Sequence, residues 1–242
     1  MVKEKESNVA GNLESYYTKP NNLVDMFEDS AAKFASRNLF GTKNKETNQY
    51  EWVTFAQVAG RVNNLRGALK KIGFEKGEKV GVIVGNSAEW FVCANATHGL
   101  GGVFVPMYEK ELQKVWQYII KDSAIKYLFV SNQKIYEIIK NFQNDIPTLK
   151  GVFMLYGSGE NSLAELEKMG KANPVLSYKP HWSETAVIIY TSGTTGDPKG
   201  VLLSHGNLTH NAKESHWTFD VGEEEVGLSI LPWAHKIGRA HV

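Results

Sequence analysis

The run Val80-Gly-Val-Ile-Val84 is an apolar stretch of strand length that directly follows a strong helical pattern. In that pattern Thr54 and Gln57 form a capping box, apolar residues recur at helical spacing as far as Ile72, and Gly73 is a natural stop. The spacing also fits a coiled-coil seam, but the repeat is short and strands follow at once. A helix that leads into a buried strand therefore favours a globular α/β fold.

The same alternation continues along the chain. Further strands are expected at 103–105, 127–130, 152–155 and 186–190. One face of a helix between them is expected to carry Leu112, Val115, Trp116, Ile119 and Ile120. Another helix is expected over 162–169, where Ser162 and Glu165 form a second capping box. Strands separated by helices in this way predict a mostly parallel sheet flanked by helices.

Smaller elements surround this core. We expect a helix over 22–34, a hairpin of 39–41 with 50–53, a helix that begins at His205 and a strand over 228–231. The polar stretch 157–180 predicts that a second layer begins near Glu184. Residues 1–20 read as a polar lead-in.

Composition excludes several classes of protein. The 242 residues carry a net charge of +1 and are 42% hydrophobic, which is typical of a globular protein and gives no reason to expect a nucleic-acid partner. Cys93 is the only cysteine, so an internal disulfide is excluded. No signal peptide or membrane-spanning stretch of ~20 apolar residues is present, which predicts an intracellular protein.

The run Tyr190-Thr-Ser-Gly-Thr-Thr-Gly-Asp-Pro-Lys-Gly-Val201 carries the chemistry. Small residues let backbone N–H groups approach a ligand closely, hydroxyls add donors, and Lys199 adds a compact positive charge. The P-loop pattern does not fit, because Pro198 precedes the lysine and Gly200 follows it. A surface turn is the simpler alternative, but a turn needs only one or two such residues. We therefore predict a phosphate-binding loop between two strands.

The segment Tyr190–Gly200 resembles the signature of the acyl-adenylate-forming (AMP-binding) superfamily, which reads aromatic residue, Thr-Ser-Gly-Thr-Thr-Gly, variable residue, Pro-Lys-Gly. Residues 54–69, 80–90 and 99–106 resemble other parts of that family. Residues 105–109 and 231–235 resemble its long-chain fatty acid–CoA ligase branch. The resemblance implies that 21–236 is a partial AMP-binding domain, the N-terminal part of the family's large domain.

The resemblance also implies a reaction. A fatty acid carboxylate attacks the α-phosphate of Mg²⁺-ATP, and CoA then displaces AMP from the acyl-adenylate. Most of the Mg²⁺ ligands would lie outside this chain, so no metal-ligating residue is assigned here. The implied location is cytoplasmic or the cytosolic face of a membrane, with peripheral membrane association of the full-length enzyme. The chain alone is expected to be inactive. The alternatives are another acyl or aryl acid adenylating enzyme and a non-catalytic nucleotide-binding truncation.

Residue roles follow from the same resemblance. The predicted binders of the ATP phosphates are Thr191, Ser192, Gly193, Thr194, Thr195, Gly196 and Lys199. Lys199 would neutralise the departing pyrophosphate. His235 would contact the carboxylate and α-phosphate, although a histidine at a strand end can also bond locally. Trp233 would either line the acyl pocket or belong to the core.

Other conspicuous residues have simpler interpretations. His98, His205, His210 and His216 show no paired metal-ligand spacing, and we expect His205 to cap or pack locally. Cys93 is expected to be a small core residue of an apolar helix, and Glu223–Glu225 a solvated turn.

The last residues, 237–242, differ from the family pattern. They can be encoded by ATC GGA AGA GCA CAC GTC, which after AG matches the start of a common sequencing adapter. We interpret them as a non-native tail from adapter read-through. The alternatives are a natural splice form or a divergent end, and the nucleotide sequence would decide between them.

Overall fold

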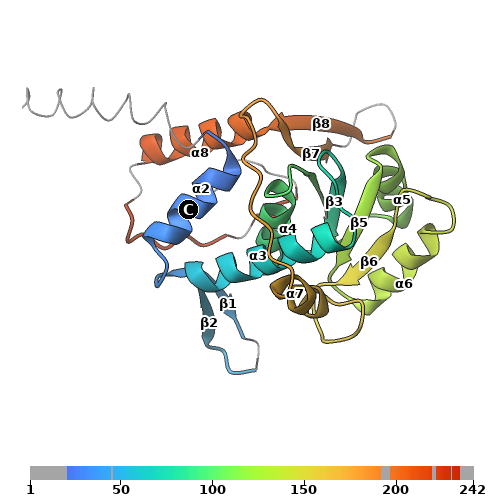
Figure 1. Ribbon diagram of the computed structural model, residues 1–242, viewed down its shortest axis with the longest axis horizontal. Coiled ribbons are helices and arrows are strands. Elements are labelled where there is room, and N and C mark those ends of the chain that lie inside the picture. The colour runs from blue at the N-terminus through green and yellow to red at the C-terminus, as the bar shows by residue number, and fades with distance from the viewer. Residues whose placement is uncertain (1–20, 45, 192–196, 220–221, 230, 235–242) are drawn as a thin grey trace, which may run out of the picture.

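The centre of the molecule is a six-stranded sheet in the order β6-β5-β3-β4-β7-β8 (Figure 1). This computed structural model describes residues 21–44, 46–191, 197–219, 222–229 and 231–234. The strands are β3 (Lys79–Ile83), β4 (Val103–Met107), β5 (Ile125–Val130), β6 (Gly151–Met154), β7 (Thr185–Thr191) and β8 (Lys199–Ser204). Neighbouring strands are parallel except β7 and β8, which are antiparallel. The prediction of a mostly parallel α/β sheet is confirmed.

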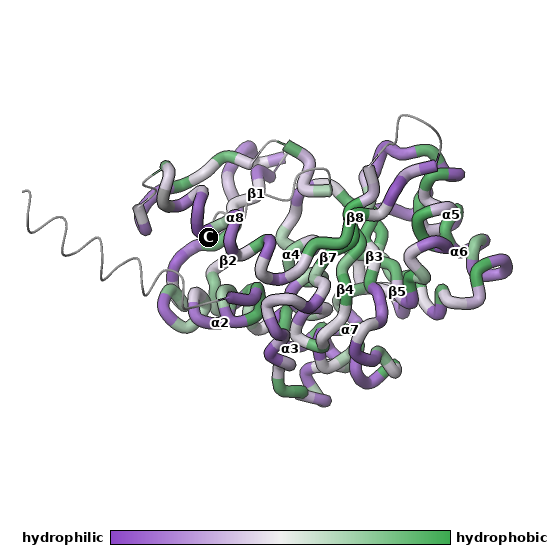
Figure 2. Tube along the Cα trace, turned by 90° about the horizontal axis from the view of Figure 1, so that it is seen from above, coloured by the Kyte–Doolittle hydropathy of each residue, from purple (hydrophilic) through white to green (hydrophobic). Residues whose placement is uncertain are grey.

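Helices cover both faces of the sheet. One face packs against α2 (Leu23–Lys33), α3 (Phe55–Lys71), α4 (Ala88–His98) and α7 (Leu163–Lys171). The other packs against α5 (Gln113–Asp122) and α6 (Gln133–Phe142). In β4 the side chain of Phe104 joins the first cluster, while Val103 and Val105 join the second. Figure 2 shows the hydrophobic residues concentrated along the central strands, as expected for strands buried on both faces.

Helix ends follow the sequence closely in α3. The side chain of Thr54 accepts from Gln57 N, and Gln57 returns a bond to Thr54 N, so the capping box is confirmed. Gly73 has a φ of +93°, and Phe74 N donates to Leu69 O at 2.9 Å, which closes the helix. In α7 only one of the two bonds of the expected capping box forms. Ser162 accepts from Glu165 N, but the Glu165 carboxylate lies 2.5 Å from Lys168 Nζ.

The remaining elements were also predicted in part. A separate two-stranded hairpin joins β1 (Asn38–Lys43) to β2 (Tyr50–Thr54), and α8 (His205–Phe219) begins at the expected residue. Leu112 precedes α5 and is 62% exposed, so it does not share the buried face of that helix.

Two predictions are wrong. No second layer begins near Glu184, because β7 pairs in parallel with β4 and so belongs to the same sheet. The strand expected over 228–231 is absent from the described residues there: Leu228 and Ser229 have no regular secondary structure and Leu231 lies at a bend. Pro232, the next residue, offers no backbone donor, and Leu231 O accepts from the side chain of Asn86.

Candidate functional site

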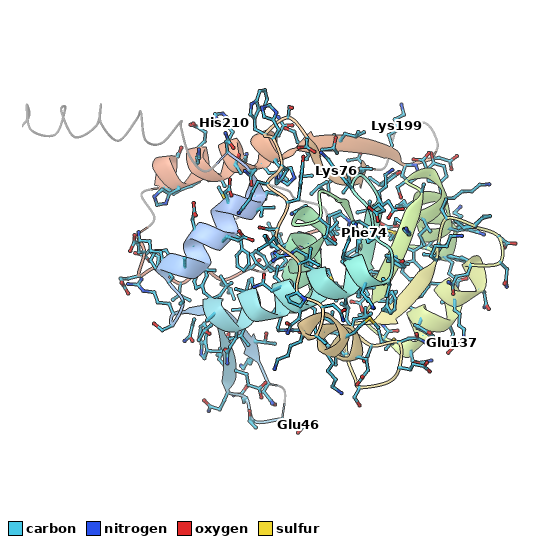
Figure 3. The ribbon with its side chains drawn as sticks, in the orientation of Figure 1. Glu46, Phe74, Lys76, Glu137, Lys199 and His210 are labelled. Atoms are coloured by element: carbon cyan, nitrogen blue, oxygen red, sulfur yellow. The ribbon has the colours of Figure 1, made fainter. Side chains whose placement is uncertain are left out.

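The predicted phosphate loop joins two antiparallel strands. In the register of β7 and β8, Thr191 lies opposite Lys199 and Tyr190 lies opposite Gly200. The prediction that two strands flank the loop is therefore confirmed. Thr191 and Lys199 are both exposed, and Figure 3 shows Lys199 at the start of β8, next to the loop. The other predicted phosphate-binding residues, 192–196, lie outside the described residues.

The base of the hairpin is held by an aromatic side chain. The Tyr190 hydroxyl donates to Asp122 Oδ2 at 2.5 Å, at the C-terminal end of α5. Burial and the Asp122 carboxylate raise the pKa of Tyr190, so its hydroxyl keeps the proton that it donates. Gly200 leaves room for this ring, because a Cβ there would lie 3.1 Å from Tyr190 Cζ and 2.9 Å from Ile188 Cγ2.

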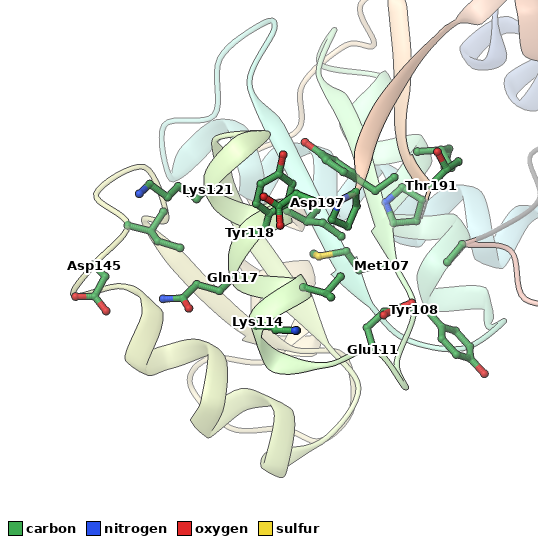
Figure 4. A pocket seen from close by; sticks show the side chains of 18 residues that line it. Met107, Tyr108, Glu111, Lys114, Gln117, Tyr118, Lys121, Asp145, Thr191 and Asp197 are labelled. Atoms are coloured by element: carbon green, nitrogen blue, oxygen red, sulfur yellow. The ribbon is translucent and has the colours of Figure 1, made fainter. Parts of the chain in front are cut away.

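A cavity of about 1040 Å³ lies beside the hairpin (Figure 4). Thr191, Asp197 and Pro198 line it from the loop side, and Ala234 lines it from the C-terminal segment. The rest of the wall comes from the end of β4 and the turn after it, from α5, from the residues after α6 and from β7: Pro106, Met107, Tyr108, Glu111, Lys114, Val115, Gln117, Tyr118, Ile119, Lys121, Asp145, Ile146, Ile189 and Tyr190. The cavity lies at the carboxyl ends of β4 and β7, where parallel sheets commonly bind ligands.

Charge and polarity in the cavity are mixed. Lys114 and Lys121 bring two cationic side chains, and Glu111, Asp145 and Asp197 bring carboxylates. Figure 4 shows Thr191 and Lys121 on opposite sides of the cavity. Cations near a hydroxyl-bearing strand end suit a phosphate, and the apolar wall of Met107 and Ile119 suits a less polar group.

Ser229 and residues 231–234 are attached to the turn after β3. Asn86 Oδ1 accepts from Trp233 N at 2.9 Å, and Asn86 Nδ2 donates to Leu231 O at 2.8 Å. The indole of Trp233 donates to Ser229 Oγ at 2.7 Å. Its ring packs 5.2 Å from Trp90 and 6.0 Å from Phe40, measured between centroids.

The structure thus brings together only part of the predicted site. Thr191 and Ala234 share the cavity, and Lys199 pairs with Thr191 across the hairpin. Trp233 is half-buried beside Trp90, so its role at an acyl pocket stays a prediction. The predicted catalytic residue His235 lies outside the described residues.

Two histidines pack together beneath the sheet. His98 at the end of α4 and His205 at the start of α8 are buried, with ring centroids 5.1 Å apart. The Nε2 atom of His98 lies 3.1 Å from Ala186 O, and the Nδ1 atom of His205 accepts from Leu23 N at 3.3 Å. The expectation that His205 packs locally is confirmed.

Other sequence interpretations can now be placed. Cys93 is a fully buried core residue of α4, and burial raises the pKa of its thiol. Glu223–Glu225 form an exposed turn, as expected. Glu223 Oε1 lies 2.5 Å from Lys33 Nζ, and Glu224 Oε1 lies 2.7 Å from Arg37 Nη2. These ion pairs connect the turn to α2 and its end.

Sequence reasoning missed two polar side chains. Asn86 lies in the turn after the parallel strand β3, and polar residues at that edge of a sheet are a general signal for a site. Asp122 carried no signal, because only the fold brings α5 next to β7. Within the described ranges no cluster of three or more His, Cys, Asp or Glu side chains could hold a metal ion. No helix among them is long and apolar enough to cross a membrane.

Known proteins resemble this chain along most of its length. Long chain acyl-CoA synthetase 5 of Arabidopsis thaliana is 30% identical over 239 residues, covering 89% of this chain and 36% of that protein. The long-chain-fatty-acid–CoA ligase ACSBG2 of Rattus norvegicus is 30% identical over 234 residues, covering 89% and 34%. The chain therefore spans about a third of the length of these curated relatives.

Solved structures share the fold. A long-chain-fatty-acid-CoA ligase from Archaeoglobus fulgidus superposes with a TM-score of 0.77 at 26% identity, covering 89% of this chain and 43% of that one. A putative long-chain-fatty-acid CoA ligase from Rhodopseudomonas palustris gives a TM-score of 0.78 at 21% identity, covering 88% and 52%, which shows the fold alone. The family described as AMP-binding enzyme matches residues 27–242. Because that match spans most of the sequence, the chain belongs to the AMP-binding enzyme family.

Proposed function

We propose that the protein containing this chain activates a long-chain fatty acid with ATP and transfers it to CoA. The observation that carries the proposal is the pairing of Lys199 with Thr191, which lines a cavity that Ala234 also lines. The long-chain acyl-CoA synthetase names of the relatives support the choice of substrate.

The chemistry needs little from the protein except position and charge. A carboxylate oxygen of the fatty acid attacks the α-phosphorus of ATP, and pyrophosphate leaves. The CoA sulfur then attacks the acyl carbon of the acyl-adenylate, AMP leaves, and the thiol proton is released. Lys199 would stabilise negative charge on the departing pyrophosphate. The hydroxyl of Thr191 would donate a hydrogen bond to a phosphate oxygen.

Mg²⁺ would accompany the phosphates of ATP. The described residues offer no cluster of carboxylates or imidazoles that fits a protein-bound divalent ion. We therefore assign no step to such an ion in this part of the protein, and phosphate binding rests on the loop and on Lys199.

The location of the protein follows from the proposed substrate. Because long-chain fatty acids partition into bilayers, we place the longer protein inside the cell, with peripheral contact at the cytosolic face of a membrane. Flotation of the purified protein with anionic and neutral vesicles tests this contact. Failure to float with either composition would contradict it.

The proposed activity is tested on the longer protein by fatty-acid-dependent exchange of pyrophosphate into ATP and by formation of acyl-CoA. Lys199→Ala should lower the exchange rate by about a hundredfold, as loss of one charge-stabilising donor does elsewhere. Lys199→Arg should retain more activity than Lys199→Ala. The matched control is Lys171→Ala, because Lys171 is an exposed lysine at the end of α7. Exchange that depends on an aryl acid instead would favour the alternative adenylating enzyme. Nucleotide binding without any exchange would favour the non-catalytic alternative.

A further inference from the structure

One side chain, Asn86, holds the backbone of a segment that is remote in sequence. Its amide oxygen accepts from Trp233 N at 2.9 Å, and its amide nitrogen donates to Leu231 O at 2.8 Å. The same nitrogen lies 3.4 Å from Ser229 Oγ. An amide can do this because it carries a donor and an acceptor side by side. Asn86 therefore bonds the backbone of two residues, Leu231 and Trp233, that flank Pro232.

The segment depends on these bonds. Leu231 lies at a bend, and Pro232 has no backbone N–H to offer a sheet. The described part of the segment takes part in no ladder of the sheet. Backbone groups that leave a ladder need other partners, and Asn86 supplies them for one acceptor and one donor.

Asn86 itself sits on a rigid support. It follows the buried strand β3, and the next residue, Ser87, caps α4 by accepting from Trp90 N at 3.2 Å. Trp90 then packs its ring against Trp233, 5.2 Å between centroids. The turn thus contacts the segment through both a polar and an aromatic side chain.

The held segment forms part of the cavity wall. Ala234 is 7% exposed and lines the cavity together with Thr191, Asp197 and Pro198 of the loop hairpin. Because Ala234 follows Trp233 directly, the Asn86 bonds hold the backbone next to this wall.

We propose that Asn86 is a positioning residue for the acyl side of the site. By bonding Leu231 O and Trp233 N, it sets the distance between the Ala234 wall and the phosphate-loop hairpin. This inference rests on the proposed function only where it names the acyl group. The attachment itself is independent of that function.

The attachment is tested by amide hydrogen exchange at Trp233 in the full chain. Asn86→Ala should speed exchange there by about tenfold, since it removes the acceptor of this N–H and the second bond beside it. Asn86→Asp keeps an acceptor and should keep much of the protection. Asn132→Ala is the matched control, because Asn132 caps α6 after the neighbouring strand β5. Unchanged exchange at Trp233 in Asn86→Ala overturns the proposal, whatever the activity of the protein.

The functional part is tested by kinetics on the longer protein. Asn86→Ala should lower kcat/KM for the fatty acid by about tenfold to a hundredfold, as a displaced wall would. The KM for ATP should change by less than about twofold, because the hairpin is held separately by Tyr190 and Asp122. The assignment to the acyl side is overturned if kcat/KM falls equally for the fatty acid and for ATP, or falls for ATP alone. If no variant, including the parent, shows adenylation, the proposed function fails while the exchange result still decides the attachment.

Discussion

Gly200 is the residue on which the geometry of the loop hairpin depends most directly. It lies opposite Tyr190 in the register of β7 and β8, and the Tyr190 ring occupies the space of its missing side chain. The ring can then reach Asp122 on α5. A glycine facing an aromatic residue across two strands thus connects the loop to the helix layer behind it.

Gly200→Ala should destabilise the protein by about 1–3 kcal/mol, because the new Cβ would lie 3.1 Å from Tyr190 Cζ and 2.9 Å from Ile188 Cγ2. Gly60→Ala is the control within α3, where a new Cβ would meet no atom within 4 Å. That change should stabilise the helix by about 0.5–1 kcal/mol. Urea unfolding of the three proteins measures both effects. Equal midpoints for Gly200→Ala and the parent would contradict the packing argument.

Site residues were predictable where the chain itself places them together. The run from Tyr190 to Val201 indicates the loop, and Pro198 excludes the helix that a P-loop requires. Asn86 and Asp122 were not predicted, because their partners are Trp233 and Tyr190, distant in sequence. A pattern within a short window contains no information on such pairs.

At the scale of elements, the contact between α4 and α8 includes two buried imidazoles. Burial and the neighbouring His205 lower the pKa of His98 to about 3, although the Ala186 carbonyl acts in the opposite direction. Burial lowers the pKa of His205 to about 4, against the carboxylate of Glu184. An unfolded chain has histidines of ordinary pKa, near ~6.5. Between these values the unfolded state binds more protons than the folded state.

The contribution of these histidines to folding stability should therefore be fully present above about pH 6.5 and fall as the pH drops towards 4, by roughly 1 kcal/mol per pH unit. Thermal unfolding at pH 7 and pH 5 measures this loss. His98→Gln keeps an amide donor for Ala186 O and should show a smaller loss between the two pH values than the parent.

His210→Gln is the control, since the side chain of His210 is 65% exposed. Glu184 titrates outside this window. Although burial alone would raise its pKa, bonds from Lys76, His181 N and Tyr178 lower the pKa to about 2. An identical pH dependence in His98→Gln and the parent would show that the buried pair does not cause the loss.

Elements with a local signal were predicted well. The Thr54 box and Gly73 define α3 because both ends are closed by residues within one turn. The expected strand over 228–231 is absent from the described residues there, and at its end Leu231 O accepts from the Asn86 side chain instead of from a strand. Leu112 was placed on a buried face because periodicity alone cannot show that the helix begins one residue later.

At the scale of the whole molecule, the chain covers about a third of its curated relatives. It contributes the loop hairpin and one cavity wall. We therefore expect these 242 residues alone to form no detectable acyl-CoA, and the longer protein to form it under the same conditions. A coupled thioester assay with both proteins, each checked by circular dichroism for folding, decides this. Sustained turnover by the shorter chain would show that the described residues suffice.

The order of strands could not be predicted from the sequence. Apolar runs show that strands exist, but β7 lies beside β4 although α5, β5, α6, β6 and α7 intervene along the chain. The expected second layer near Glu184 was wrong for this reason. The strand beside which β7 packs depends on how the helices cover the sheet. A local sequence pattern contains no information on that packing.

The single thiol of the chain allows the rate of opening of this core to be measured. Cys93 is the only cysteine, it is fully buried in α4, and its pKa is raised. A thiol-labelling reagent can reach it only when α4 separates from the sheet, so the rate of labelling measures how often that separation occurs. Labelling of the native Cys93 thus measures opening of the core without an engineered cysteine, and on the same helix that ends at His98.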